Sequence, residues 1–201
     1  MRPCHKLRAG LLLGLALSFA TPAAAQSLDD VIAPLPDLAS EKPLTRGDLV
    51  AWLAVQNLSM QAFEHCYAKL SPSQYHLLFS DVPVDHPYAP HLCAAIRSGM
   101  IDGYEDASFR PDAPVNVAEA AKIMTRALGI DVAPQGRGEP WYMPYLQALA
   151  MRNVIPLDIS NPAQSVTAAL IQRMLDRLVS ESAPYPSRTQ EEVKSWGKYY
   201  R

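Results

Sequence analysis

The chain has 201 residues, of which 49% are hydrophobic, 18 are lysine or arginine and 20 are aspartate or glutamate, giving a formal net charge of −2. This length suits one domain with a buried core. The slightly acidic balance argues against nucleic acid or an anionic membrane as the main partner, because both attract basic proteins.

Residues 1–25 have the pattern of a secretory signal peptide. Basic residues precede an apolar run at 11–20, and three alanines follow at 23–25. The apolar run is shorter than the roughly 20 residues that a membrane span requires, and no later window replaces it. We therefore predict an exported protein of the periplasm or cell surface without a membrane span. Cleavage before Gln26 would remove only basic charges and leave the chain more acidic.

The rest of the chain reads as an all-α protein. Residues 26–42 contain two prolines and no sustained apolar period, which predicts an extended leader. Residues 183–201 would form a C-terminal tail, a capping helix or an arm that docks a partner. Between them, apolar residues at helical spacing alternate with proline and glycine. This spacing predicts helices at 43–58, 60–70, 87–99, 115–128, 141–153 and 166–179.

Three of the predicted helices begin with related sequences. The stretches are LTRGD from Leu44, VNVAE from Val115 and VTAAL from Val166. Internal repeats of this size usually share one core, because a single unit cannot bury its apolar face. We predict helix-loop-helix repeats over residues 43–182, with the three equivalent helices forming a central bundle of pseudo-threefold arrangement.

Each of these helices starts at a capping residue. An acid three residues later completes a capping box in two of them, Thr45 with Asp48 and Asn116 with Glu119, whereas Thr167 caps its helix alone. Arg46 is unusual, because a cation in the first turn opposes the helix dipole. An arginine beside free backbone N–H groups can receive a carboxylate or another anion. The alternative for Arg46 is a solvated or salt-bridged side chain.

One segment carries a family resemblance. Residues 79–130 resemble a complete S-layer homology repeat, with flanking partial and degenerate repeats at 43–78 and 139–182. The matching positions are Phe79, Asp81 and Val82, then Gly99, then the loop residues Gly103, Tyr104, Asp106, Phe109, Arg110 and Pro111. In the third repeat Trp141 is kept, and Asn153 replaces the glycine of the first helix.

The resemblance implies a non-catalytic module that attaches to the cell envelope by binding a cell-wall polysaccharide or peptidoglycan in a groove between repeats. Arg46 takes the place of the family's motif arginine, whereas Val117 and Ala168 occupy the equivalent positions. The candidate ligand-binding residues are Arg46, Thr45, Asp48, Trp52, Trp141, Tyr104 and Arg110.

Several of these candidates have structural alternatives. Tyr104 and Arg110 belong to a loop whose aromatic residues would plug the bundle. Trp52, Trp141 and Tyr142 could stack on sugar rings, but they could equally pack in the core. The alternative function is a structural or protein-interaction scaffold that has lost glycan binding and contacts other envelope proteins.

Cys66 and Cys93 are the cysteines that would remain after export. They could form a disulfide in an oxidising compartment or stay as two separate buried thiols. The histidines and cysteines show no metal-ligand spacing, and no catalytic motif is present. We therefore expect no metal, no cofactor and no enzymatic activity.

Overall fold

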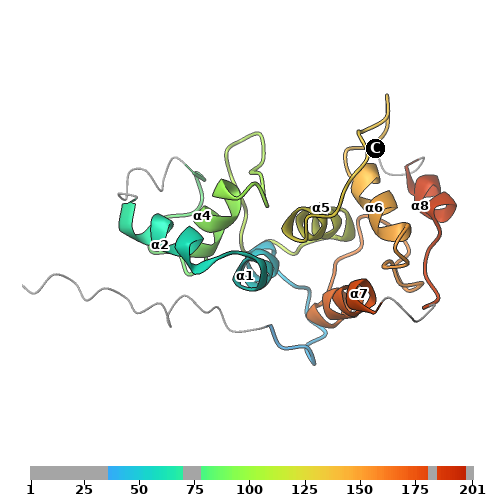
Figure 1. Ribbon diagram of the computed structural model, residues 1–201, viewed down its shortest axis with the longest axis horizontal. Helices are drawn as coiled ribbons and strands as arrows, with labels where there is room; N and C mark the ends of the chain where they lie inside the picture. The colour runs from blue at the N-terminus through green and yellow to red at the C-terminus, as the bar shows by residue number, and fades with distance from the viewer. Residues whose placement is uncertain (1–35, 70–77, 181–184, 198–201) are drawn as a thin grey trace, which may run out of the picture.

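The computed structural model describes residues 36–69, 78–180 and 185–197, and this part of the chain is all-α, as predicted (Figure 1). The predicted signal peptide and residues 26–35 of the leader lie outside the described residues. The helices are α1 (Arg46–Asn57), α2 (Met60–Lys69), α4 (Ala89–Arg97), α5 (Val117–Ala127), α6 (Met143–Ala150), α7 (Ala168–Val179) and α8 (Gln190–Trp196).

The predicted caps begin α1, α5 and α7. The backbone N–H of Asp48 donates to the Thr45 hydroxyl at 3.0 Å, and that of Glu119 donates to the Asn116 side chain at 3.0 Å. Both acids return a bond to the cap backbone, so both capping boxes are complete. Thr167 caps α7 without an acid. These contacts satisfy N–H groups that a helix start otherwise leaves unpaired.

Three backbone hydrogen bonds join the residues that precede these caps. The N–H of Leu44 donates to Val166 at 2.8 Å, that of Val166 donates to Val115 at 3.1 Å, and that of Val115 donates to Leu44 at 2.9 Å. The bonds form a closed ring, which brings the N-terminal ends of α1, α5 and α7 together. The pseudo-threefold arrangement of whole repeats stays a prediction.

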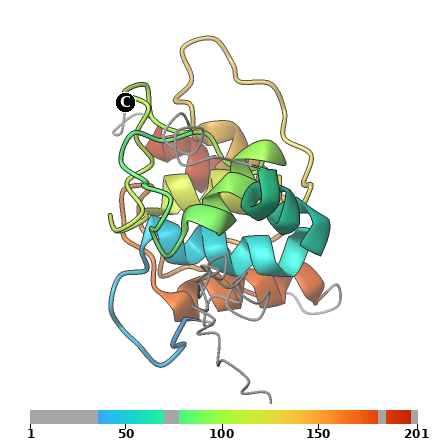
Figure 2. The ribbon, with the colours of Figure 1, turned by 90° about the vertical axis from the view of Figure 1, so that its left-hand side faces the viewer.

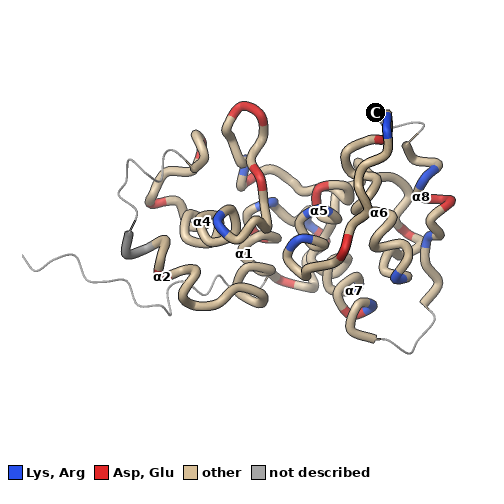
Figure 3. Tube along the Cα trace, turned by 45° about the horizontal axis from the view of Figure 1, so that its top comes forward, with Lys and Arg blue, Asp and Glu red and all other residues tan. Residues whose placement is uncertain are grey.

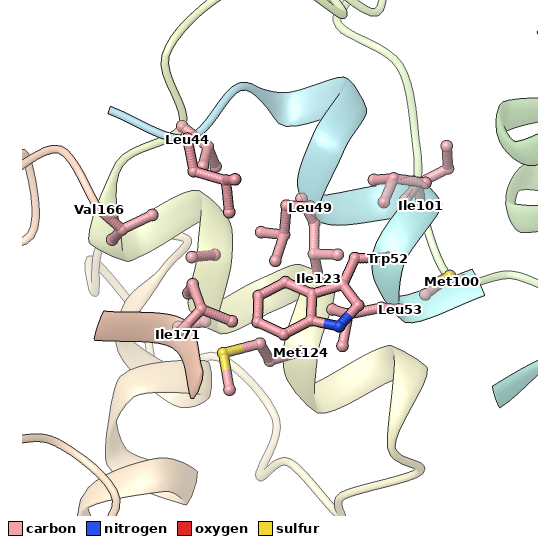
Figure 4. Packing of buried hydrophobic residues seen from close by; sticks show 14 of the residues in the cluster. Leu44, Leu49, Trp52, Leu53, Met100, Ile101, Ile123, Met124, Val166 and Ile171 are labelled. Atoms are coloured by element: carbon pink, nitrogen blue, oxygen red, sulfur yellow. The ribbon is translucent and has the colours of Figure 1, made fainter. Parts of the chain in front are cut away.

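The core lies between these three helices. Figure 4 shows side chains from α1, α5 and α7 directed toward a common centre, among them Leu49, Leu53, Met124 and Ile171. All four are fully buried. Each such side chain contributes about 1.5–3 kcal/mol through removal of its surface from water.

A disulfide joins two helices at one end of the molecule. Cys66 of α2 and Cys93 of α4 are bonded, with their Cα atoms 6.0 Å apart. α4 in turn packs against α1, and Figure 2 looks onto this side of the molecule. The bond therefore ties α2, through α4, to the helix that carries Arg46.

The C-terminal segment ends in a helix that completes the opposite end. Val193 and Trp196 of α8 are buried in the core, and α8 packs against α6. The N–H of Arg188 donates to the carbonyl of Ile155 at 2.8 Å. This bond holds the C-terminal segment against residues 139–182. The described part of the tail is thus a helix that covers α6.

Asn153 has the same left-handed backbone conformation as Gly99, the residue with which it aligns. Gly99 has a φ of 76° and Asn153 has a φ of 57°, both in the left-handed region. Asparagine is one of the few residues that tolerate this region. The turn after α6 therefore keeps its shape although the glycine is replaced.

Candidate functional site

A pocket of about 550 Å³ lies where α1, α5 and the loop between α4 and α5 meet. It brings together four of the predicted binding residues, namely Arg46, Tyr104, Arg110 and Trp141. The other three, Thr45, Asp48 and Trp52, do not line it. The seven charged side chains in its lining are Arg46, Asp102, Glu105, Asp106, Arg110, Glu119 and Lys122.

The loop that forms one wall is fixed by Asp81. Its carboxylate accepts the backbone N–H groups of Phe109 at 2.8 Å and Arg110 at 2.6 Å. These bonds support Arg110 at a φ of 60°, which is uncommon for a residue with a side chain. A Cβ at Gly103 would lie only 3.0 Å from the ring of Phe79 and 3.0 Å from the carbonyl of Ser108, so glycine suits this close approach. The aspartate and glycine of the repeat thus shape this wall.

Arg46 lines the pocket but is only 7% exposed. Its Nε donates to the carbonyl of Phe109 at 3.0 Å, and its Nη1 forms an ion pair with Glu119 at 3.2 Å. The guanidinium carbon lies 4.7 Å from the ring centres of both Tyr104 and Phe109. Of the alternatives open from the sequence, the structure shows a salt-bridged arginine that is buried rather than solvated.

The expectation that Arg46 lies beside free backbone N–H groups is wrong. The N–H of Arg46 donates to the carbonyl of Ala113 at 2.9 Å, and that of Gly47 donates to Pro111 at 2.8 Å. The chain that leads into α5 therefore covers the start of α1. The N-terminal end of this helix is not available as an anion site.

Thr45 and Asp48 contact each other and Tyr88 rather than the pocket. The Tyr88 hydroxyl donates to the carboxylate of Asp48. Burial and this nearby carboxylate raise the pKa of Tyr88 to about 12. Trp52 is 4% exposed and belongs to the core. In the structure, these three predicted binding residues cap α1 or fill the core.

Trp141 is the exposed aromatic residue at the pocket. Its side chain is 47% exposed, whereas Tyr142, the other aromatic candidate beside it, is 6% exposed and packs in the core. The ammonium of Lys122 lies 5.7 Å from the centre of the Trp141 ring. Trp141 can therefore offer a ring face to a ligand.

Tyr104 links the loop to α5. Its hydroxyl donates to the carboxylate of Glu119 at 2.6 Å, and its ring lies between the guanidinium groups of Arg46 and Arg110, at 4.7 and 4.0 Å. Burial and the bond to Glu119 raise the pKa of Tyr104 to about 12. Tyr104 is therefore uncharged throughout the physiological pH range.

The exposed cations of the pocket are paired with acids. Lys122 contacts Asp102 at 3.0 Å, and Arg126 contacts the same carboxylate at 2.7 Å. Partial burial alone would raise the pKa of Asp102, but the bonds from the two cations outweigh it and lower the pKa. Arg110 contacts Asp106 at 2.9 Å, and the pKa of Asp106 falls to about 2 because of its bonds to Ser108 and Arg110.

Lys122 and Asp102 were not found from the sequence. Lys122 lies three residues after Glu119, so the two share a face of α5. That spacing places Lys122 beside Glu119, but it does not show that Glu119 meets Arg46, because that contact joins two helices. In Figure 3, acidic residues mark the loop between α4 and α5, and basic residues lie on the neighbouring helices.

Within 36–69, 78–180 and 185–197, no three or more histidine, cysteine, aspartate or glutamate side chains are grouped so that they could hold a metal ion. No helix in these ranges combines the length and apolar character needed to cross a membrane.

Comparison with known proteins identifies the family of the central repeat. Residues 78–121 match the S-layer homology domain. Over 140 residues, the chain is 30% identical to a protein named "Surface layer protein" from Brevibacillus choshinensis. This match covers 70% of the chain but only 12% of the length of that relative. No solved structure matches the chain.

The fold and the family match together define an all-α protein that contains an S-layer homology domain. Domains of this family anchor S-layer proteins to the cell wall. The match therefore relates the central repeat of this chain to proteins of the surface layer.

Proposed function

We propose that this protein attaches to the cell envelope by binding a cell-wall glycan or peptidoglycan-associated polymer in the pocket between α1 and α5. The observation that carries the proposal is the exposed ring of Trp141 at a pocket whose polar groups are already held in place. An aromatic face fits the apolar face of a sugar ring, and fixed polar groups bind its hydroxyls without first being ordered.

The ligand contacts in this proposal come from the exposed part of the pocket. Trp141, Lys122 and Arg110 are within reach of a polymer, because their side chains are partly exposed. Arg46 supports the wall from behind through Tyr104 and Glu119. Its role is to position the aromatic wall, in place of the direct contact that the family resemblance implies.

Export is part of the same proposal. Residues 1–25 would direct secretion, and residues 43–182 would form the repeat domain that faces the wall. The disulfide between Cys66 and Cys93 supports an oxidising location, because such bonds persist outside the reducing cytosol.

The test is co-sedimentation of the protein with purified cell-wall sacculi. We expect Trp141→Ala to weaken pelleting by at least about tenfold, which corresponds to loss of a contact of roughly 1.4 kcal/mol. Tyr185→Ala is the matched control, because Tyr185 is also an exposed aromatic residue, 41% exposed, and does not line the pocket. Equal pelleting of both variants and wild type would place the binding surface elsewhere.

Failure of the wild type to pellet with any wall fraction would reject envelope binding through a glycan. The alternative of a scaffold that contacts envelope proteins would then be preferred. Folding of each variant is checked by its thermal unfolding curve, so that loss of binding is not confused with loss of structure.

A further inference from the structure

Trp141 belongs to the segment that links α5 to α6. Residues 128–142 of this segment form no helix, and Figure 2 shows it as a long loop outside the helices. Residues 133–138 are all exposed. A backbone with so few buried contacts opens easily, and a side chain at its end would share that freedom. A fixed position of the Trp141 ring therefore requires a specific anchor.

Glu139 supplies such an anchor. One oxygen of its carboxylate accepts the backbone N–H of Gly136 at 2.8 Å, and the other accepts the side-chain amide of Gln147 at 2.9 Å. Gln147 lies on α6, so the carboxylate joins the loop to this helix. The backbone carbonyl of Glu139 accepts a further bond from the side chain of Gln135. Hydrogen bonds to an ionised acceptor are stronger than bonds between neutral groups.

Trp141 lies between this anchor and the start of α6. Pro140 precedes it with a fixed φ, and the N–H of Met143 donates to the carbonyl of Pro140 at 3.0 Å. The Trp141 ring meets the ring of Tyr142 edge-on, with the ring centres 5.6 Å apart, and Tyr142 is buried. The backbone is thus held on both sides of Trp141, and its ring rests against a buried neighbour.

Glu139 lies outside the lining of the pocket, whereas Trp141 belongs to that lining. We infer that Glu139 is a positioning residue, which holds Trp141 in the orientation that receives the wall polymer. This inference rests on the proposed function, which assigns the polymer contact to Trp141. A ring that is held in place before binding loses less conformational freedom when the ligand arrives, so Glu139 adds to the affinity without contacting the ligand.

Acrylamide quenching of tryptophan fluorescence tests the position of Trp141 without any ligand. The other two tryptophans, Trp52 and Trp196, are 4% and 7% exposed, so this neutral quencher reports mainly on Trp141. We expect Glu139→Ala to raise the quenching constant by up to about twofold, because the ring is 47% exposed and gains access when the segment opens. Glu64→Ala is the control, because it removes the same charge from an exposed position on α2 that does not line the pocket. Equal quenching in wild type and Glu139→Ala would overturn the inference, even if Glu139→Ala had a lower Tm.

Co-sedimentation with sacculi tests the effect on binding. Glu139→Ala should weaken pelleting by about two- to tenfold, because the freed ring must be ordered on binding. Glu139→Gln should recover most of this loss, since its amide oxygen can accept from Gly136 and its amide nitrogen can donate to Gln147 once that amide has turned over. Weakening by Glu139→Gln as large as that by Glu139→Ala would contradict the role of these bonds.

The double variant shows whether Glu139 acts through Trp141. In a Trp141→Ala background, Glu139→Ala should cause no further loss of pelleting, because two residues that act through one contact are not additive. A further loss there would overturn the inference, because Glu139 would then act independently of the ring. Normal pelleting of Trp141→Ala would instead reject the proposed function, and raised quenching in Glu139→Ala would still show that Glu139 positions the ring.

Discussion

Arg46 is expected to stabilise the fold strongly, and Arg46→Ala tests this directly. The side chains of Arg46 and Glu119 are 8% and 14% exposed, so their ion pair is largely shielded from water. Removing one partner of a buried pair costs about 3–5 kcal/mol, because the other charge is left uncompensated. The lost contacts to the rings of Tyr104 and Phe109 belong to the same cost.

The measurement is urea unfolding of wild type, Arg46→Ala and Arg110→Ala, followed by circular dichroism. We expect a loss of about 3–5 kcal/mol for Arg46→Ala, or about 6–20 °C in Tm for a domain of this size. Arg110→Ala is the control, because the Arg110 side chain is 51% exposed and water screens its ion pair with Asp106, so the loss of stability should be much smaller. A loss below about 1 kcal/mol for Arg46→Ala would refute the reasoning. Arg46 could then act as a direct ligand contact.

Gly47→Ala should destabilise the protein by about 1–3 kcal/mol, because its Cβ would lie 2.4 Å from the Tyr88 ring. In a Tyr88→Ala background the same change should be neutral or stabilising in thermal unfolding, and an unchanged cost there would contradict the steric explanation. Reduction of the disulfide, which closes a separation of 27 residues, should cost about 3–4 kcal/mol, and a Tm unaffected by reductant would argue against this contribution. Tyr104 should ionise near pH 12 in a titration followed by tyrosinate absorbance. The Tyr104→Phe variant should therefore lose absorbance change near pH 12, and its absorbance change near pH 10, where ordinary tyrosines ionise, should stay the same.

The sign of the tyrosine effect on stability follows from the direction of its pKa shift. The folded state raises the pKa of Tyr104 from 10.0 to about 12, so it favours the protonated hydroxyl that donates to Glu119. This contribution is fully present below pH 10 and is lost as the pH rises toward 12. Tyr104→Phe should therefore make unfolding less dependent on pH in that window.

Features that depend on nearby residues could be predicted from the sequence. The caps of Thr45 and Asn116 each involve an acid three residues later. The helices were predicted to within a few residues of their ends for the same reason. In each case the interacting groups lie within one turn of helix, where sequence spacing fixes their distance.

Features that depend on distant residues could not be predicted in this way. The carbonyl that binds Arg46 belongs to Phe109, which is 63 positions later in the chain. The carbonyls of Pro111 and Ala113 accept hydrogen bonds from N–H groups of α1 that the sequence analysis expected to be free. Lys122 meets Asp102 only because the loop folds back onto α5. The pairing of the charged side chains around the pocket is therefore a property of the tertiary structure.

The start of α5 packs against the loop before α7 in the same way as the start of α1 packs against the loop before α5. Comparison of these two interfaces shows what Arg46 contributes to the first one. The first two N–H groups of α1 and of α5 donate to loop carbonyls in the same pattern: Arg46 to Ala113, Gly47 to Pro111, Val117 to Gln164 and Ala118 to Pro162. This backbone arrangement therefore forms with a buried valine in the motif position and does not require an arginine. At the first interface, the arginine instead contacts the rings of Tyr104 and Phe109 and the acid of α5. Because the backbone pattern forms at the second interface without an arginine, the particular contribution of Arg46 at the first interface is to hold the aromatic wall of the pocket.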